Sequence, residues 1–293
     1  VRTLLIALEL DDDAAAGRPA TDAEGLQLVN ALAACPNVTD LSIRPLPPSV
    51  RIPLLAAMAS KQLESLVCAP RLNTPHSALF HAADLVAIAK YSLRKLEMDC
   101  WAIPLEGRDA PLPSFPPLVN LTHLKLAFAG AEPLVLHLLA ASRSLEAAIV
   151  YVECMYDDPA ALASALLPSA STLRRLTFKT NSPLESFPGQ QPPYPPTFNR
   201  ILPHFQQLEY LSISATEISA EALRTLPPSL THLEIESITD FPHFDFSEFL
   251  LRTIASTHFT LRSLIIHDDS WHPDEAEEVR VACASRGIQF GWG

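Results

Sequence analysis

The chain has 293 residues, of which 48% are hydrophobic and 18% are charged. This composition can supply a large apolar core and is too apolar for a disordered tail. The formal net charge of -12 argues against nucleic acid or an anionic membrane as the main partner, because both require a basic surface. No apolar run approaches the roughly 20 residues that a transmembrane helix needs, so we expect no membrane span.

The cysteines indicate the compartment, and the first residues indicate whether the chain is part of a longer protein. Five cysteines occur, and no two of them form a C-x-x-C pair. Because the number is odd, we expect reduced thiols and a cytoplasmic or nuclear protein. The residues from Val1 to Thr3 lack an initiator Met and are followed by no secretory-signal pattern, which favours a piece of a longer protein.

The pattern L-x-x-L-x-L recurs along the whole chain and is clearest at Leu121, Leu124 and Leu126. We call each six-residue occurrence of this pattern a frame. The pattern Leu5-x-x-Leu8-x-Leu10 provides a frame at the start, and eight further frames begin at Val38, Leu63, Leu93, Leu145, Leu173, Leu208, Leu230 and Leu261. From Val38 onward, successive frames lie 22 to 35 residues apart. Self-similarity of this kind marks a repeat protein, in which each unit buries its apolar side against its neighbours.

Helical patterns fill the segments between the frames. Thr21 to Glu24 has the form of a capping box, and Asp158-Pro159 marks a second helix start. A last helix begins at Pro273 and ends before Gly287, and the strand 288–290 closes the chain. Helical spacing with weaker end signals is found in segments 51–60, 81–90, 131–142, 219–226 and 245–256.

The alternation of strands and helices predicts an α/β fold with parallel strands joined by right-handed crossovers. We predict a single domain over residues 1–293: a leucine-rich-repeat solenoid, or horseshoe, of about ten irregular repeats. Its parallel β-sheet should line the concave face, and its helices should cover the convex face.

Segment 182–198 is a proline-rich insertion into one repeat. Six prolines between Asn181 and Phe198 prevent a helix and lengthen this repeat to 35 residues. Pro192-Pro193-Tyr194-Pro195 has P-x-x-P spacing but no flanking basic residues. A plain loop and an SH3-type ligand are the two interpretations of this segment.

Motifs for catalysis or cofactor binding are missing from the sequence. None of the eight glycines belongs to a phosphate-binding loop or a nucleophile elbow, so we predict no enzyme activity and no cofactor. No metal site is predicted either, because an exposed turn before a helix explains the cluster His267, Asp268, Asp269, His272 and Asp274. The aromatic residues of segment 241–249 are interpreted as packing at the start of a helix.

The third and fifth residues of each frame should face solvent, because strand side chains alternate. In the middle of the solenoid these positions combine basic residues with the apolar Ile149, which fits an acidic or phosphorylated protein segment. The predicted protein-binding residues are Lys95, Glu97, His123, Lys125, Ile149, Arg175, Tyr210 and His232. The alternative is that Glu97 only pairs with Lys125 across neighbouring strands and that a loop covers Ile149.

Several of these features resemble the leucine-rich region of fungal F-box proteins. The repeats are irregular in length and contain helices between the strands. Asn rarely follows the strand, and only Asn181 has that position. The chain closes with a helix, a glycine and a strand, from Pro273 to Trp292. The resemblance covers nearly the whole chain. It implies that the repeats hold a protein substrate for an SCF-type ubiquitin ligase, whose linker subunit would be a partner only if an F-box precedes Val1. The alternative is a leucine-rich regulator of an enzyme, of the GTPase-activating or inhibitor type, without any ubiquitin role.

Overall fold

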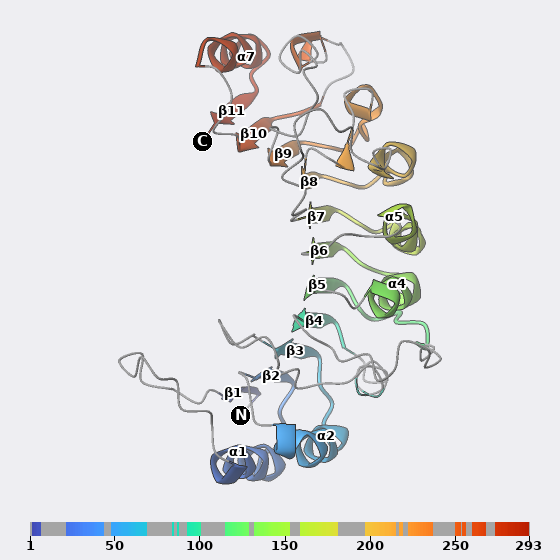
Figure 1. Ribbon diagram of the computed structural model, residues 1–293, viewed down its shortest axis with the longest axis vertical. Coiled ribbons are helices and arrows are strands. Elements are labelled where there is room, and N and C mark those ends of the chain that lie inside the picture. The colour runs from blue at the N-terminus through green and yellow to red at the C-terminus, as the bar shows by residue number, and fades with distance from the viewer. Residues whose placement is uncertain are drawn as a thin grey trace, which may run out of the picture. The chain divides into compact units, whose positions relative to one another are not determined.

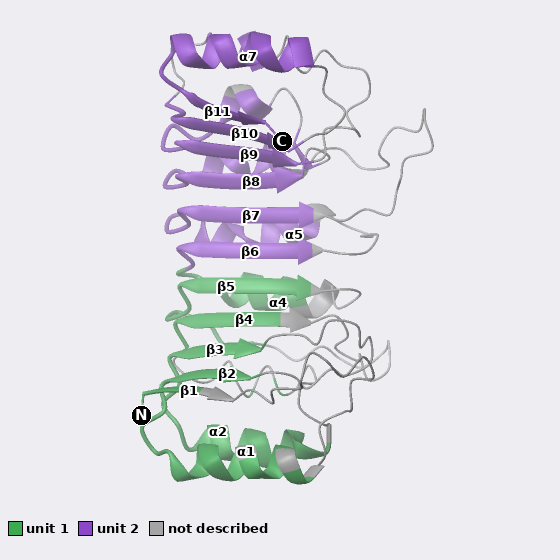
Figure 2. Cartoon of the chain, turned by 90° about the vertical axis from the view of Figure 1, so that its left-hand side faces the viewer, with its two compact units in different colours: residues 1–144 green, residues 145–293 purple. Residues whose placement is uncertain are grey.

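The computed structural model describes sixteen parts of the chain. They are residues 2–6, 22–43, 48–68, 84, 87, 93–100, 115–128, 132–152, 159–180, 197–214, 217–218, 222–236, 250–252, 254–255, 260–267 and 273–292. The chain divides into two compact units, Val1–Ser144 and Leu145–Gly293 (Figure 2). The single domain that the sequence favours stays a prediction.

The first unit contains five parallel strands that pair in the order of the sequence. They are β1 (Thr3–Ile6), β2 (Asp40–Ile43), β3 (Ser65–Cys68), β4 (Lys95–Cys100) and β5 (His123–Phe128). From β2 onward, each strand begins at the third residue of its frame, so the second apolar residues of neighbouring frames lie opposite one another.

The second unit contains six parallel strands, again in the order of the sequence. They are β6 (Ala147–Val152), β7 (Arg175–Thr180), β8 (Tyr210–Ser214), β9 (His232–Glu236), β10 (Ser263–His267) and β11 (Gln289–Trp292). The predicted α/β class with parallel strands is therefore confirmed.

Helices lie to one side of the strands within each unit (Figure 1). The first unit contains α1 (Asp22–Ala34), the 3-10 helix η1 (Pro48–Val50), α2 (Arg51–Ala59) and α4 (Glu132–Ala141). The second contains α5 (Pro159–Ala165), α7 (Pro273–Ser285) and the 3-10 helices η2 (Leu167–Ser169), η3 (Thr197–Arg200), η4 (Leu202–His204) and η6 (Ala222–Thr225). Most residues of the expected helices 81–90 and 245–256 lie outside the described part of the chain.

The core is built from the apolar residues of the frames. Leu124 is 2% exposed and Leu176 is fully buried, and the first and third apolar residues of these frames are buried with them. The residues between them are part-exposed or exposed, which gives the alternation of a strand with one buried side. We call the side that carries the third and fifth frame residues the polar strand face.

Two expectations about elements are wrong. In the first frame, Leu4 and Ile6 take the positions that were expected for Leu8 and Leu10, because β1 pairs Leu4 with Leu41 and Ile6 with Ile43. In the described part of segment 219–226, residues 222–225 form the 3-10 helix η6 in place of an α-helix, because Pro227 and Pro228 follow closely and disfavour α-helix in the residues before them.

The end of the proline-rich segment is anchored in the core. Residues 181–196 lie outside the described part of the chain, but Thr197–Arg200 forms η3. Phe198, the last residue of the expected loop 182–198, is fully buried, with its ring centroid 4.7 Å from that of Phe178 on β7. This aromatic contact fixes where the insertion rejoins the repeat.

The same backbone contact joins successive repeats. The carbonyl oxygen of Arg94 accepts hydrogen bonds from the N–H groups of both Thr122 and His123, each 2.9 Å long. We call this arrangement the shared-carbonyl ladder. The carbonyls that accept two such bonds are those of Arg2, Thr39, Glu64 and Arg94 in the first unit and of Glu146, Arg174, Glu209 and Thr231 in the second. The ladder sets the register with backbone atoms alone.

The last helix ends as its sequence predicts. Gly287 has a φ angle of 71°, and the N–H of Ile288 donates to the carbonyl of Cys283 at 2.9 Å while that of Gly287 donates to Ala284 at 3.1 Å. This pair of bonds is a Schellman cap, which requires a left-handed residue and therefore favours glycine. The cap returns the chain to the sheet as β11.

Candidate functional site

The predicted binding residues of the first unit lie on β4 and β5. Lys95 is opposite His123 in the ladder, and Glu97 is opposite Lys125. The ion pair, however, joins two residues of the same strand: Lys95 Nζ lies 2.8 Å from Glu97 Oε1. Glu97 therefore reduces the positive charge that Lys95 was expected to present, while the side chains of His123 and Lys125 are exposed.

The predicted binding residues of the second unit lie on four successive strands. Arg175 on β7 is exposed, and its guanidinium carbon lies 4.8 Å from the centroid of the Tyr210 ring on β8. His232 on β9 is exposed and opposite Tyr210, and its Nδ1 lies 2.8 Å from the hydroxyl of Thr231. Ile149 on β6 is part-buried. Lys95, Glu97, His123 and Lys125 belong to the other unit, so one continuous binding surface stays a prediction.

The structure adds side chains that the sequence analysis missed, two residues beyond the fifth frame position. These are Tyr151, Lys179 and Glu236 on β6, β7 and β9; His267 has the same position on β10, but the sequence assigned it to an exposed turn. Because strand side chains alternate, they share the polar strand face with Arg175 and Tyr210. They would have been found in the sequence if each frame had been extended to its seventh residue.

Lys179 connects three strands. Its ammonium forms an ion pair with Glu236 on β9 and lies 5.8 Å from the centroid of the Tyr151 ring on β6. The strand between β7 and β9 carries the small residue Ser214, which is buried and leaves space for the lysine to reach across. The side chains of Lys179 and Glu236 are each 24% exposed, so this pair is partly desolvated.

Glu234 is the centre of a second set of contacts on the same face. One of its oxygens accepts a hydrogen bond from the Tyr210 hydroxyl, and the other lies 2.9 Å from His267 Nε2. Burial raises the pKa of Glu234, but the hydrogen bonds from Tyr210 and His267, together with the nearby positive charge of Lys179, hold the pKa below its usual range. Burial, and then the contact with Glu234, raises the pKa of Tyr210 to about 12, so the phenol keeps its proton.

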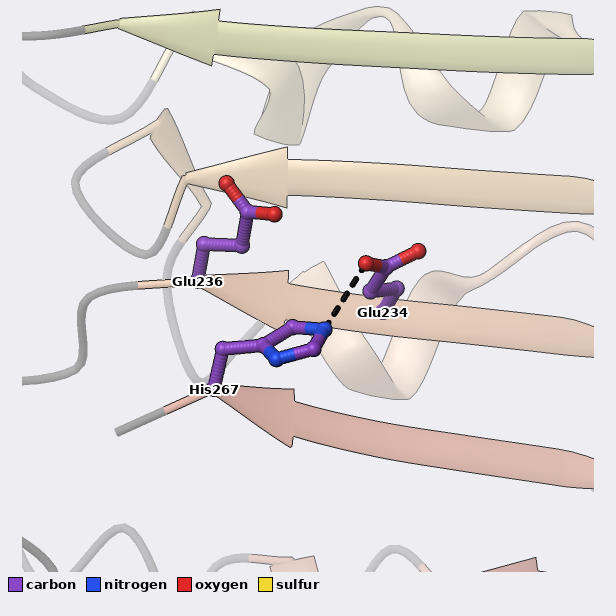
Figure 3. A group of neighbouring side chains, drawn as sticks. All are labelled: Glu234, Glu236 and His267. Atoms are coloured by element: carbon purple, nitrogen blue, oxygen red, sulfur yellow. Dashed lines mark hydrogen bonds and ion pairs between the residues drawn. The ribbon is translucent and has the colours of Figure 1, made fainter. Parts of the chain in front are cut away.

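Glu234, Glu236 and His267 form a compact group (Figure 3). One ligand-type atom from each residue lies within 4.8 Å of those from the other two. The cluster expected from the sequence joined His267 with Asp268, Asp269, His272 and Asp274 instead. The first three of these partners lie outside the described residues, as does segment 241–249, and Asp274 lies in the first turn of α7. The partners of His267 come from β9, about thirty residues earlier, and only the strand register brings them together.

Comparison with protein-family models and with curated proteins finds no match for this chain. Within the described ranges, no helix is both long and apolar enough to cross a membrane. The polar strand face is therefore the feature of the molecule that bears most directly on function.

Proposed function

We propose that the chain is a protein-interaction module, the substrate-recognition part of an F-box-like receptor of the leucine-rich-repeat type. The observation that supports this proposal most is the row of Arg175, Tyr210 and His232 on three successive strands of the second unit. Neighbouring strands lie about 4.8 Å apart, so these side chains can contact one extended ligand segment. Arginine and tyrosine also contribute strongly to binding energy in many protein interfaces.

The proposed partner is an acidic or phosphorylated protein segment. Arg175 is exposed and its guanidinium lies over the Tyr210 ring, so it can pair with a carboxylate or phosphate at little cost in side-chain freedom. Lys125 and His123 offer basic groups in the first unit, and part-buried Ile149 offers an apolar contact in the second. Electrostatic attraction would then set the association rate, and apolar contact would slow dissociation.

A charge-reversal experiment tests the proposal. Arrays of acidic peptides, with and without phosphoserine, are screened with the wild-type chain, and the best peptide is titrated by fluorescence polarisation. Lys125→Glu/Arg175→Glu is expected to weaken binding by about tenfold or more, which corresponds to about 1.4 kcal/mol. The matched control is Arg143→Glu/Arg200→Glu, which makes the same charge change at one exposed residue of each unit, away from the polar strand face.

The outcome is decided by comparing the two double variants at equal thermal stability. Equal loss in both would show that net charge alone attracts the peptide, and no loss in Lys125→Glu/Arg175→Glu would refute this binding face. The ubiquitin role is tested separately by mixing the full-length protein with the SCF linker subunit. Failure to bind the linker would favour the enzyme-regulator alternative without affecting the peptide result.

A further inference from the structure

Glu234, Glu236 and His267 have the arrangement of a set of metal ligands. Glu234 and Glu236 are two residues apart on β9, so both project from the same side of the strand. His267 on β10 is directly opposite Glu236 in the ladder, and its ring turns toward Glu234 (Figure 3). Strands hold donor groups in position better than loops do, and all three ligand-type atoms already lie within 4.8 Å of one another.

The charges around this group leave it suited to a cation. The side chains of Glu234 and Glu236 are only 17% and 24% exposed, so water screens their mutual repulsion poorly. Lys179 supplies one positive charge for the two carboxylates. The two carboxylates therefore carry one more negative charge than Lys179 balances. Tyr210 donates to Glu234 and can orient this carboxylate, as outer-shell partners of metal ligands do.

A second observation comes from Ser212 on β8. Its side chain is 1% exposed and is opposite Glu234 in the ladder, on the same face. The Ser212 hydroxyl lies close enough to the Tyr210 hydroxyl to lower the pKa of that phenol, but its Oγ forms no hydrogen bond of normal geometry among the described residues. A buried hydroxyl without such a bond is suited to contact a water or an ion. Water on a metal held by Glu234 could donate to this oxygen.

We propose that Glu234, Glu236 and His267 bind one divalent transition-metal ion of the zinc type. Oxygen-only sites suit Ca²⁺ and Mg²⁺, whereas an imidazole nitrogen favours Zn²⁺ and its neighbours in the first transition row. Zinc bonds of about 2.0–2.2 Å to nitrogen and oxygen require closer donors than 4.8 Å, so small rotations of the three side chains complete the site. Water fills the remaining positions.

Lys179 is the group that a metal ion displaces. Its ammonium now pairs with Glu236, and a cation bound at Glu236 repels it. The Tyr151 ring already lies 5.8 Å from this ammonium and offers it a second position through a cation–π contact. The ion pair and the metal are thus alternative occupants of the same carboxylate.

Titration of the full chain, first treated with a chelator, tests the proposal. Zn²⁺ is titrated by calorimetry and Co²⁺ by visible absorption, and each is expected to bind at one ion per chain without a thiolate charge-transfer band. His267→Gln and Glu236→Gln are each expected to weaken binding by about tenfold or more. Lys179→Met should tighten binding several-fold, because it removes the competing ammonium. The control is Glu209→Gln, an exposed carboxylate of the same unit whose ion pair with Arg174 is far more solvated.

The variants also separate metal binding from a purely structural role. A structural ion-pair cluster would lose stability on Lys179→Met and gain no metal affinity, and that result would overturn the proposal. So would the absence of saturable binding to the wild-type chain, or unchanged affinity in His267→Gln with a native melting curve. The test uses no peptide, so its outcome is independent of the protein-binding proposal.

Discussion

Replacing Leu176 with alanine should destabilise the second unit by about 3 to 5 kcal/mol. Leu176 is fully buried on β7, opposite Ala148 on β6 and Leu211 on β8. Alanine has three fewer carbons, and losing their burial costs about 2.4 kcal/mol at about 0.8 kcal/mol per carbon. A cavity term adds to this, because the methyl group of Ala148 is too short to fill the space and the strand backbone is fixed on both sides.

The assay is urea unfolding followed by circular dichroism, with the slope of the transition checked against the wild type. Leu167→Ala is the matched control, since it makes the same chemical change at a residue of the same unit that is 36% exposed. We expect the control to lose less than about 1 kcal/mol. A loss of the same size in both variants, or below about 1 kcal/mol in Leu176→Ala, would refute the repeat core.

Three further predictions follow from buried or strained positions. Leu124→Ala should cost about 2 to 5 kcal/mol in the first unit by the same assay, since Leu124 is 2% exposed on β5. Gly287→Ala should cost about 1 to 2 kcal/mol in a thermal melt, because Gly287 has a φ of 71° in the cap of α7, whereas Gly287→Asn should cost less. Burial raises the pKa of Cys283 from 9.0 to about 11. In the native chain a thiol reagent should therefore label part-exposed Cys35 and Cys68 before Cys283, and stability should fall as pH rises from about 9 to about 11, because only the unfolded thiol ionises there.

The strands and the core could be predicted from the sequence because their signal is local and repeated. Each frame contains its own apolar spacing, and Leu124 and Leu176 are buried as this spacing requires. The first strand could not be placed in this way, because Leu4 with Ile6 and Leu8 with Leu10 fit the pattern about equally. Only the pairing of β1 with β2 shows that Leu4 and Ile6 are the residues of the first strand.

The polar contacts were harder to predict because they depend on register and on flexible side chains. Glu97 can reach a lysine on its own strand or on the next one, and the structure selects Lys95. The contact of His267 with Glu234 joins residues 33 positions apart. The seventh-position side chains were missed because the frame ends at the sixth residue, whereas β6 and β7 each continue to the eighth.

The shared-carbonyl ladder also determines how the chain can begin to fold. Its contacts each join neighbouring repeats: the N–H of Thr122 donates to the carbonyl of Arg94 across 28 residues, and the N–H of Thr231 donates to the carbonyl of Glu209 across 22. Each new strand therefore requires the closure of only one short loop, whose entropy changes slowly with loop length. A sheet with such local contacts can nucleate at any neighbouring pair of strands and grow one repeat at a time. During synthesis, folding of a unit can start once its first two repeats have left the ribosome, before the rest of the chain exists.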